Sequence, residues 1–307
     1  MKTSPNVVWH PLRPADASAG AALRPMRAPH KGELRGIAAR AAFDAIMLRT
    51  PAADGIEYVS ETIAGVPGVW CRPAVATNRA VLYLHGGWFV WGSADAYRNF
   101  VGHIAARAGA AVFIAGYRLA PEHPFPAAVE DVRAVYKGLF DRGLGDVIVA
   151  GDSAGGALAL ELLEWIVRQE FRAQPKGTLL LSPVTDLSLS GVTWESRDAA
   201  DLLFTKQQAC ELIALYLGDA APSLPFAPLE RDLGGFPPIR IHVGDDEMLL
   251  DDSMRFAQRA EDAGVDVRLD VWEGMLHVFP SQLATFEAAN QALDEIAAFI
   301  RSPYRII

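Results

Sequence analysis

A serine between two glycines, in the pentapeptide Gly151-Asp152-Ser153-Ala154-Gly155, is the residue of this chain with the clearest chemical potential. The β-branched run Val147–Ala150 before it predicts a strand, and the apolar stretch Ala157–Leu160 after it predicts a helix. A serine at a sharp strand-to-helix turn is held in a strained, exposed position where a base can reach its hydroxyl, and small neighbours prevent clashes. Ser153 is therefore predicted to be a nucleophile, in preference to a residue of an ordinary glycine-rich turn.

A serine nucleophile needs a base, and His277 is the best placed of the seven histidines. It follows the predicted strand Val267–Trp272, and a histidine on a loop after a late strand fits the chain order nucleophile, acid, base. The other histidines have simpler structural explanations. His10 and His30 lie in the irregular N-terminus, His103 in a helix, His123 in a proline-flanked turn and His242 inside a buried strand.

The base needs an acid to orient it, and three carboxylates compete for this role. Asp245, Asp246 and Glu247 follow the predicted strand Ile239–Val243 within one short turn. Any of the three could reach an imidazole, and the other two would then be solvated loop charges. Spacing alone leaves the choice open.

A reacting carbonyl also needs hydrogen-bond donors for the negative charge that develops on its oxygen. The tetrapeptide His85-Gly86-Gly87-Trp88 ends the predicted strand Val81–Leu84, and glycines there let backbone N–H groups approach a ligand. Trp88 keeps its N–H whatever its side chain, and Ala154 after the nucleophile offers a further donor. The predicted oxyanion hole consists of Gly86, Gly87, Trp88 and Ala154.

The composition favours one large domain and argues against several classes of partner. The chain has 307 residues, 51% of them hydrophobic, and a formal net charge of -9, which would repel phosphate backbones and anionic lipid. Cys71 and Cys210 have no metal-ligand spacing and suggest no disulfide framework, so a reducing compartment is expected. Residues Met1–Pro14 lack the apolar core of a signal peptide, and no stretch is long and apolar enough to cross a bilayer. The expectation is a cytoplasmic protein without a nucleic-acid partner, a membrane span or a metal.

Beyond the first fifty residues, strand and helix patterns alternate. Buried strands are expected at 56–59, 66–71, 81–84, 111–114, 147–150, 179–181, 239–243 and 267–272, the first two antiparallel. Helices are expected at 31–48, 99–108, 127–140, 156–170, 253–263 and 283–300, with no strand before residue 50. This alternation predicts an α/β fold with a mostly parallel sheet of about eight strands, helices on both faces and a helical cap.

One segment breaks the alternation. Residues 185–238 contain no convincing strand, a helix pattern at 206–217 and a proline-rich exit. Long departures of this kind are usually lids or binding elements, so this segment and the N-terminal helix are predicted to cap the carboxyl ends of the strands. The expected organisation is 1–50 as the N-terminal part of the cap, 51–184 as the core, 185–238 as the inserted cap segment and 239–307 as the C-terminal part of the core.

Three strings together resemble the bacterial hormone-sensitive lipase family of esterases, the α/β-hydrolase fold-3 group. They are His85-Gly86-Gly87-Trp88, the serine pentapeptide extended to Gly156, and the stretch from Tyr117 to Ala127 that reads Tyr-Arg-Leu-Ala-Pro-Glu-His-Pro-Phe-Pro-Ala. The strings are specific because they occur in the right order around the expected strands and helices. The likeness extends from about residue 30 to the C-terminal helix.

The resemblance implies an α/β-hydrolase fold with Ser153 as nucleophile, His277 as base and the oxyanion donors named above. It also implies Glu247 as the acid, because the stretch Glu247–Asp251 fits the family's acid-Pro-Leu-x-Asp frame with Glu in the first place. The two aspartates before Glu247 stay as alternatives.

Two departures from the family pattern bear on the site. Glu247 stands where the family commonly has Asp, and Trp88 stands where it usually has a third glycine, which could crowd the acyl side. The resemblance further implies a cofactor-independent serine carboxylesterase that hydrolyses short- to medium-chain esters through an acyl-enzyme. The predicted substrate pocket comprises Trp88, Phe89, Trp91, Leu203, Phe204 and Leu276.

Other functions and an assembly are also considered. An amidase or lactone hydrolase would use the same triad, and the sequence does not separate these from an esterase. A small-ligand receptor on this fold, as in the plant gibberellin receptors, is disfavoured because the resemblance implies that such receptors lose the histidine present here as His277. A homodimer is expected from the resemblance and from the strand Val267–Trp272, which is predicted to lie near the end of the sheet, where an unprotected edge invites pairing with another subunit.

Overall fold

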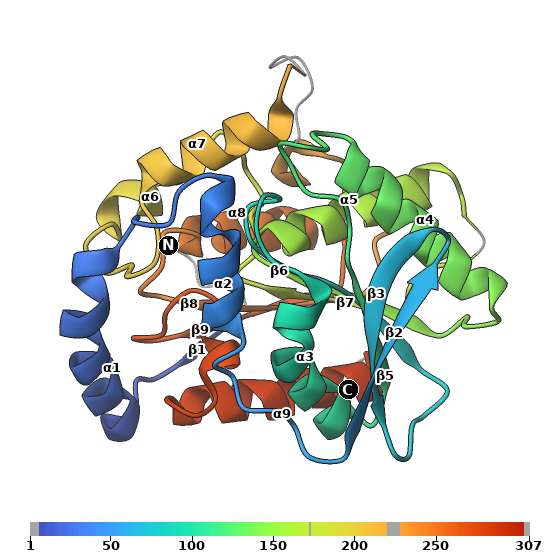
Figure 1. Cartoon of the computed structure of the whole chain (residues 1–307), viewed down its shortest axis with the longest axis horizontal. Helices are drawn as coiled ribbons and strands as arrows, with labels where there is room; N and C mark the ends of the chain where they lie inside the picture. Colours follow the sequence, from blue (N-terminus) through green and yellow to red (C-terminus); the bar gives the residue numbers. More distant parts are fainter. Residues whose placement is uncertain (1–5, 172, 220–227, 304–307) are drawn as a thin grey trace.

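The computed structural model describes residues 6–171, 173–219 and 228–303, and a nine-stranded sheet runs through its centre (Figure 1). The strands are β1 (Val7–His10), β2 (Ile56–Ile63), β3 (Val66–Pro73), β4 (Ala80–Leu84), β5 (Ala111–Ala115), β6 (Val147–Asp152), β7 (Gly177–Leu181), β8 (Ile239–Gly244) and β9 (Val267–Trp272). Their order is β1-β9-β8-β7-β6-β4-β5-β3-β2, with β3 antiparallel to β2 and β5 and all other pairs parallel. The predicted α/β fold with a mostly parallel sheet is confirmed, with one more strand than expected.

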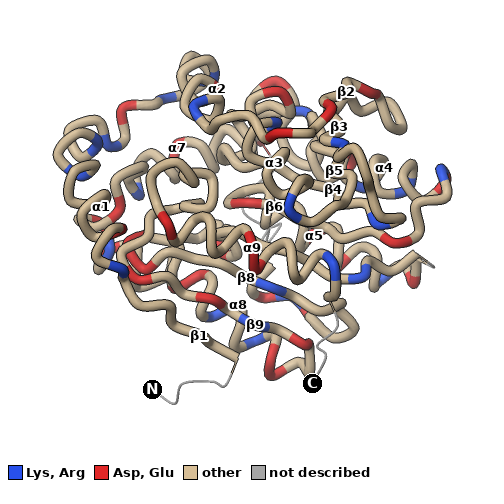
Figure 2. The backbone as a smooth tube through the Cα atoms, turned by 90° about the horizontal axis from the view of Figure 1, so that it is seen from below, with Lys and Arg blue, Asp and Glu red and all other residues tan. Residues whose placement is uncertain are grey.

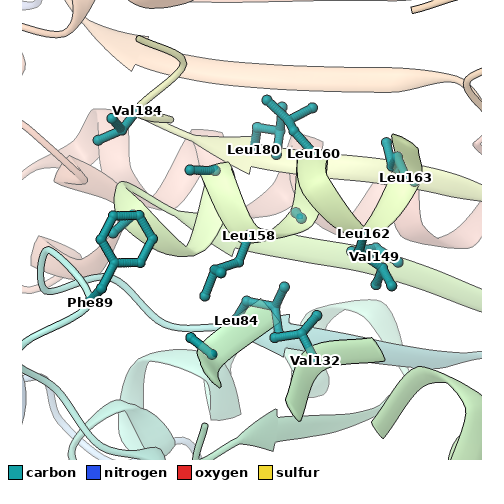
Figure 3. Close-up of a cluster of buried hydrophobic side chains, with 14 of the residues drawn as sticks. Leu84, Phe89, Val132, Val149, Leu158, Leu160, Leu162, Leu163, Leu180 and Val184 are labelled. Carbon is teal, nitrogen blue, oxygen red and sulfur yellow. The ribbon is translucent and has the colours of Figure 1, made fainter. Parts of the chain in front are cut away.

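Helices cover both faces of this sheet. One face carries α3 (Ala94–Ala108) and α9 (Glu287–Arg301), and the other carries α4 (Ala127–Asp141), α5 (Ala154–Arg168) and α8 (Leu250–Asp262). Because both faces are covered, every residue of β4 is buried, which explains the continuous apolar runs of the central strands. Figure 3 shows Leu158 and Leu162 of α5 packed against Leu84 of β4 and Val149 of β6.

The N-terminal segment differs from the prediction of one helix and no strand. It forms β1, α1 (Pro14–Arg27), η1 (Ala28–His30), η2 (Ile37–Ala39) and α2 (Arg40–Met47). β1 has only four residues and exists through its pairing with β9, so its local sequence gives little signal. Pro14 is compatible with α1 because it is the first residue of the helix, where an N–H has no intrahelical partner.

Pairing with β1 also means that β9 is not an edge strand. Val7–His10 runs parallel to Leu269–Trp272, the His10 ring stacks on Trp272 at 3.8 Å, and His10 Nε2 lies 2.9 Å from Asp270 Oδ1. β9 does lie near the end of the sheet, as predicted, but the expected unprotected edge is wrong, because the chain covers β9 with its own N-terminal strand. The edge of β9 therefore gives no support to the expected homodimer.

The second irregular segment contains α6 (Thr193–Ser196), α7 (Lys206–Leu217) and η3 (Pro228–Glu230), and α7 has the predicted bounds. We call residues 6–50 and 185–219 the cap segments. They lie side by side in Figure 1, in blue and yellow, and are linked by Lys31 to Asp198 at 2.8 Å and by Arg35 to Glu211 at 2.7 Å. The four-part division of the chain stays a prediction.

Basic and acidic positions are mixed along the backbone. Lys and Arg positions are interspersed with Asp and Glu positions over the view in Figure 2. Across the described ranges, no helix has both the length and the apolar composition needed to span a bilayer.

Candidate functional site

Ser153 stands at the turn between β6 and α5, as the sequence predicts. Its φ of 53° and ψ of -121° lie outside the regions that residues with a Cβ prefer, a strain worth about 1–3 kcal/mol. The surrounding backbone holds this turn, since Ser153 N–H donates to Leu181 O at 2.9 Å and Ser153 O accepts from Val184 N–H at 3.0 Å. Such a strained, well-anchored turn is the geometry of a nucleophile elbow.

The hydroxyl-bearing residue is more enclosed than the sequence suggests. Ser153 is only 4% exposed and lines a cavity of about 540 Å³ whose wall includes both cap segments. Its solvent access therefore runs through this cavity, a volume that suits a small organic ligand.

Glycines bring the loop after β4 against the elbow. A Cβ at Gly155 would lie 2.0 Å from Leu84 O, and a Cβ at Gly86 would lie 2.3 Å from Asp152 Oδ2 and 3.1 Å from Ser153 Cβ. Distances this short exclude any side chain at either position.

His277 and Glu247 form a close pair. His277 Nδ1 lies 2.6 Å from Glu247 Oε2, and His277 lines the same cavity as Ser153. A carboxylate at Nδ1 selects the tautomer with the proton on Nδ1 and leaves Nε2 free to act as a base. Asp245 instead accepts from Gly274 N–H at 2.5 Å, and Asp246 pairs with Arg24 at 2.8 Å, so Glu247 is the one of the three that contacts the imidazole.

Ser182 fixes the position of Glu247. Its hydroxyl donates to Glu247 Oε1 at 2.8 Å and accepts from Val278 N–H at 3.1 Å, and Gly244 N–H also donates to Oε1 at 2.7 Å. Both side chains are buried, so these hydrogen bonds are shielded from water. Sequence reasoning missed Ser182, and its signal was a polar residue directly after a buried strand, at the sheet edge where the other site residues lie.

Asp201 was also missed, and it joins one cap segment to the loop that carries the acid. Its buried carboxylate accepts from Met248 N–H at 3.1 Å and from Leu203 N–H at 2.8 Å. No sequence pattern identifies its link to the loop that carries Glu247, because Met248 lies far from Asp201 in the chain.

The pKa of His277 is set by opposing influences. Burial alone would lower it, but the carboxylate of Glu247, supported by Asp201 and Asp152, more than offsets burial and raises the pKa above the ordinary 6.5. The imidazole is therefore a stronger base than a free histidine.

The loop after β4 is only partly available as an oxyanion hole. Gly86 N–H donates to Asp152 Oδ1 at 3.0 Å, so the prediction of Gly86 as an oxyanion donor is corrected. Tyr83 and Tyr97 hold the same carboxylate through hydroxyls at 2.9 and 3.0 Å, and burial raises the pKa of Asp152 to about 6. Gly87, with a φ of 113°, and Trp88, with a φ of 54°, both line the cavity and remain candidates with Ala154.

His85 of the same motif has a structural role. It stacks on Tyr117 at 4.3 Å, its Nδ1–H donates to Gly86 O at 2.8 Å, and Tyr117 donates to His85 O at 2.6 Å. Burial lowers the pKa of His85 to about 4, so its ring is neutral near pH 7. The neutral ring fixes the shape of the loop without adding charge.

Of the six predicted pocket residues, four line the cavity: Trp88, Trp91, Leu203 and Phe204. Phe89 and Leu276 do not. Phe89 is fully buried in the core (Figure 3) and is stacked on Tyr216 with ring centroids 3.8 Å apart. Leu276 packs in a separate buried cluster with Trp272. Trp88 and Phe89 are neighbours and both have positive φ angles, yet only Trp88 lines the cavity, which adjacency in sequence does not reveal.

A group of potential metal ligands lies elsewhere. In the part of the chain that the structure describes, His10, Asp270 and Glu295 bring ligand atoms within 4.8 Å of one another. Arg240 and Arg268 already pair with Asp270 at 3.3 and 2.6 Å, so two cations occupy the place a metal ion would take. The group is an ion-pair network that ties β1 to β9.

Comparison with known proteins agrees with this geometry. Residues 81–281 match a family model described as alpha/beta hydrolase fold. An acetyl-hydrolase of Streptomyces hygroscopicus is 36% identical over 78% of this chain and 81% of the relative, and an esterase of Acinetobacter venetianus is 34% identical over 90% and 92%. Among solved structures, an esterase from the bacterial hormone-sensitive lipase family aligns with a TM-score of 0.87 at 34% identity, covering 94% of this chain and 98% of that one.

Proposed function

Because the chain belongs to the α/β hydrolases, among the esterases of the bacterial hormone-sensitive lipase family, we propose that it hydrolyses carboxylic esters through an acyl-enzyme on Ser153. The observation that carries this proposal is the 2.6 Å contact between His277 and Glu247, beside a cavity that Ser153 also lines on its strained turn. Nucleophile, base and orienting acid are the groups that acyl transfer needs.

In the first half-reaction, Ser153 Oγ attacks the ester carbonyl while His277 Nε2 takes the hydroxyl proton. Glu247 keeps the proton on Nδ1 and stabilises the imidazolium. Backbone N–H groups of Gly87, Trp88 and Ala154 are proposed to hold the oxyanion, and losing one such donor typically costs about 3 kcal/mol of transition-state stabilisation. Collapse of the tetrahedral intermediate expels the alcohol, which receives its proton from His277.

In the second half-reaction, water attacks the acyl-enzyme. His277 takes a proton from this water, and Ser153 leaves with that proton as the acid product is released. The chain's own residues supply every proton transfer in this cycle.

Short- to medium-chain acyl groups fit the proposal best. Phe204 stands edge-on to Trp88 at 5.5 Å and to His277 at 5.1 Å, so aromatic rings restrict the cavity beside the base. An amidase or lactone hydrolase would use the same groups, and no further observation favours it. The pairing of His277 with a buried carboxylate supports catalysis over a receptor that only binds.

Replacement of the nucleophile tests the proposal. Ser153→Ala should lower hydrolysis of 4-nitrophenyl butyrate by roughly 10⁴-fold or more and abolish labelling by a fluorophosphonate, with an unchanged fold by circular dichroism. Ser18→Ala is the matched control, because Ser18 lies on α1 and its hydroxyl donates only to Pro14 O within that helix. Near-native turnover by Ser153→Ala would refute the assignment.

A further inference from the structure

The lining of the cavity that holds Ser153 includes several charged residues. Arg27, the last residue of α1, and Arg49, just after α2, line it together with His30 and Glu33. Neither arginine takes part in the chemistry proposed above. Two cations therefore face the site where the substrate must bind.

These two arginines have no protein partner within the described ranges, which sets them apart from other arginines of the cap. Arg24 pairs with Asp246, Arg35 with Glu211 and Arg40 with Glu122, at 2.8, 2.7 and 2.6 Å. No such ion pair or side-chain hydrogen bond joins Arg27 or Arg49 to a described residue.

The position of Arg27 is unfavourable for its charge. Burial and the neighbouring Arg49 both lower the pKa of Arg27, although a guanidinium stays protonated at any ordinary pH. Both arginines lie near helix C-termini, where the helix dipole favours a cation by about 0.3–1 kcal/mol. That effect is also available to a side chain turned to solvent, so it does not explain why two guanidinium groups face one cavity.

No other charged residue that lines the cavity forms an ion pair with Arg27 or Arg49 among the described residues. Glu33 pairs with His30 at 2.8 Å in a largely exposed contact. Asp152 is enclosed by the tyrosine hydroxyls and Gly86 N–H. An anion brought in by a ligand would therefore meet two unpaired guanidinium groups.

We propose that Arg27 and Arg49 bind an anionic group of the substrate, so that the preferred esters carry a carboxylate or a phosphate remote from the reacting carbonyl. This inference rests on the proposed function, since it names the substrate class of the same site. Guanidinium groups bind both anions through paired N–H donors. Arg27 is partly buried and Arg49 is exposed, so partial shielding from water strengthens the contact with Arg27 in particular.

Matched ester pairs test the inference. Monoethyl adipate is compared with ethyl hexanoate for an anion on the acyl side, and 6-acetoxyhexanoate with hexyl acetate for an anion on the alcohol side. A further arm, 6-acetoxyhexyl phosphate, distinguishes phosphate from carboxylate. For each pair the measured quantity is the ratio of kcat/KM for the anionic ester to kcat/KM for the neutral ester.

Arg27→Gln and Arg49→Gln should each lower this ratio by about tenfold for at least one pair, and added salt should lower it in the wild type. Arg49→Glu should lower it further through direct repulsion. Arg35→Gln is the matched control, because it removes the same charge from the N-terminal cap segment at a residue that does not line the cavity. Ratios in both glutamine variants equal to the wild-type ratio, or an equal fall in Arg35→Gln, would overturn the inference.

A binding experiment separates this inference from the proposed function. Calorimetry on Ser153→Ala with 6-hydroxyhexanoate should show binding that weakens about tenfold when Arg27→Gln or Arg49→Gln is added. Ester hydrolysis with unchanged ratios and arginine-independent binding refutes only the anion site. Arginine-dependent binding without any ester hydrolysis refutes the esterase and supports the anion site.

Discussion

The two walls of the cavity are held together in different ways. The core wall presents Ser153 and His277, and their supports, Asp152 and Glu247, lie in buried networks of hydrogen bonds. The cap wall rests on apolar contacts and on ion pairs such as Arg35 to Glu211, whose side chains are 51% and 43% exposed. Exposed ion pairs are typically worth about 0–1 kcal/mol, whereas buried charge-assisted hydrogen bonds are stronger. The core wall therefore holds the proposed catalytic groups firmly, whereas changes in the cap wall are expected to cost the fold little.

Glycines show the same contrast. A Cβ at Gly155 in the core wall would meet backbone atoms of Leu84 and His85 at 2.0 and 2.6 Å, while a Cβ at Gly20 in α1 would meet nothing within 4 Å. Adding one methyl group at each of these positions tests the comparison at its two extremes.

The largest effect is expected for Gly155→Ala. The new methyl group would push the elbow away from β4, so the free energy of unfolding should fall by about 3 kcal/mol or more and ester hydrolysis should be lost. Urea denaturation and a 4-nitrophenyl butyrate assay measure both. A variant with the wild-type midpoint and rate would show that the elbow does not need this close approach.

Glu247→Gln should lower kcat/KM by about 10²- to 10⁴-fold, because the amide no longer stabilises the imidazolium. The active form has neutral His277, so activity falls as pH drops through the pKa of this group. The wild-type acid limb should lie above pH 6.5, since Glu247 raises that pKa. Without the carboxylate, burial dominates and the limb should move to lower pH.

The pH profile of kcat/KM checks this prediction. Asp246→Asn is the control, because Asp246 pairs with Arg24 and not with the imidazole. A large loss in Asp246→Asn with little change in Glu247→Gln would move the acid to the neighbouring position.

A smaller effect is expected for Phe204→Ala. Removing this ring opens the cavity beside His277, so the rate on 4-nitrophenyl octanoate relative to butyrate should rise about 3- to 10-fold, as each added CH₂ buried contributes about 0.8 kcal/mol. Phe89→Ala is the matched control, because Phe89 packs in the core and does not line the cavity. This substitution should lower the free energy of unfolding by about 3 kcal/mol without changing the octanoate-to-butyrate ratio. An equal change in both variants would contradict the division between the two walls.

The smallest effect is expected for Gly20→Ala. A methyl group on an open position of α1 should raise the free energy of unfolding by about 0.5–1 kcal/mol through helix propensity, with unchanged ester hydrolysis. Thermal unfolding of the variant beside the wild type is the measurement. A loss of stability would mean that α1 has neighbours on this side in solution.

The sequence by itself determined the parts of this protein that depend on local pattern. Apolar runs and their alternation with helical stretches predicted the parallel sheet, and Ser153 between its glycines predicted the elbow, because strand, turn and helix are adjacent in the chain. The same order suggested His277 after the last strand of the core. Periodicity carries such information without reference to distant residues.

Only the tertiary structure decided what depends on distant partners. Spacing alone leaves three acidic residues in one turn equivalent, and the family resemblance favours Glu247. The contact of Glu247 with His277 in the folded chain distinguishes it from the other two. Gly86 lost its predicted role because Asp152, distant in the chain, accepts its N–H, and β1 exists because β9 pairs with it. Pairings of this kind are energetic consequences of the completed fold, and no local pattern encodes them.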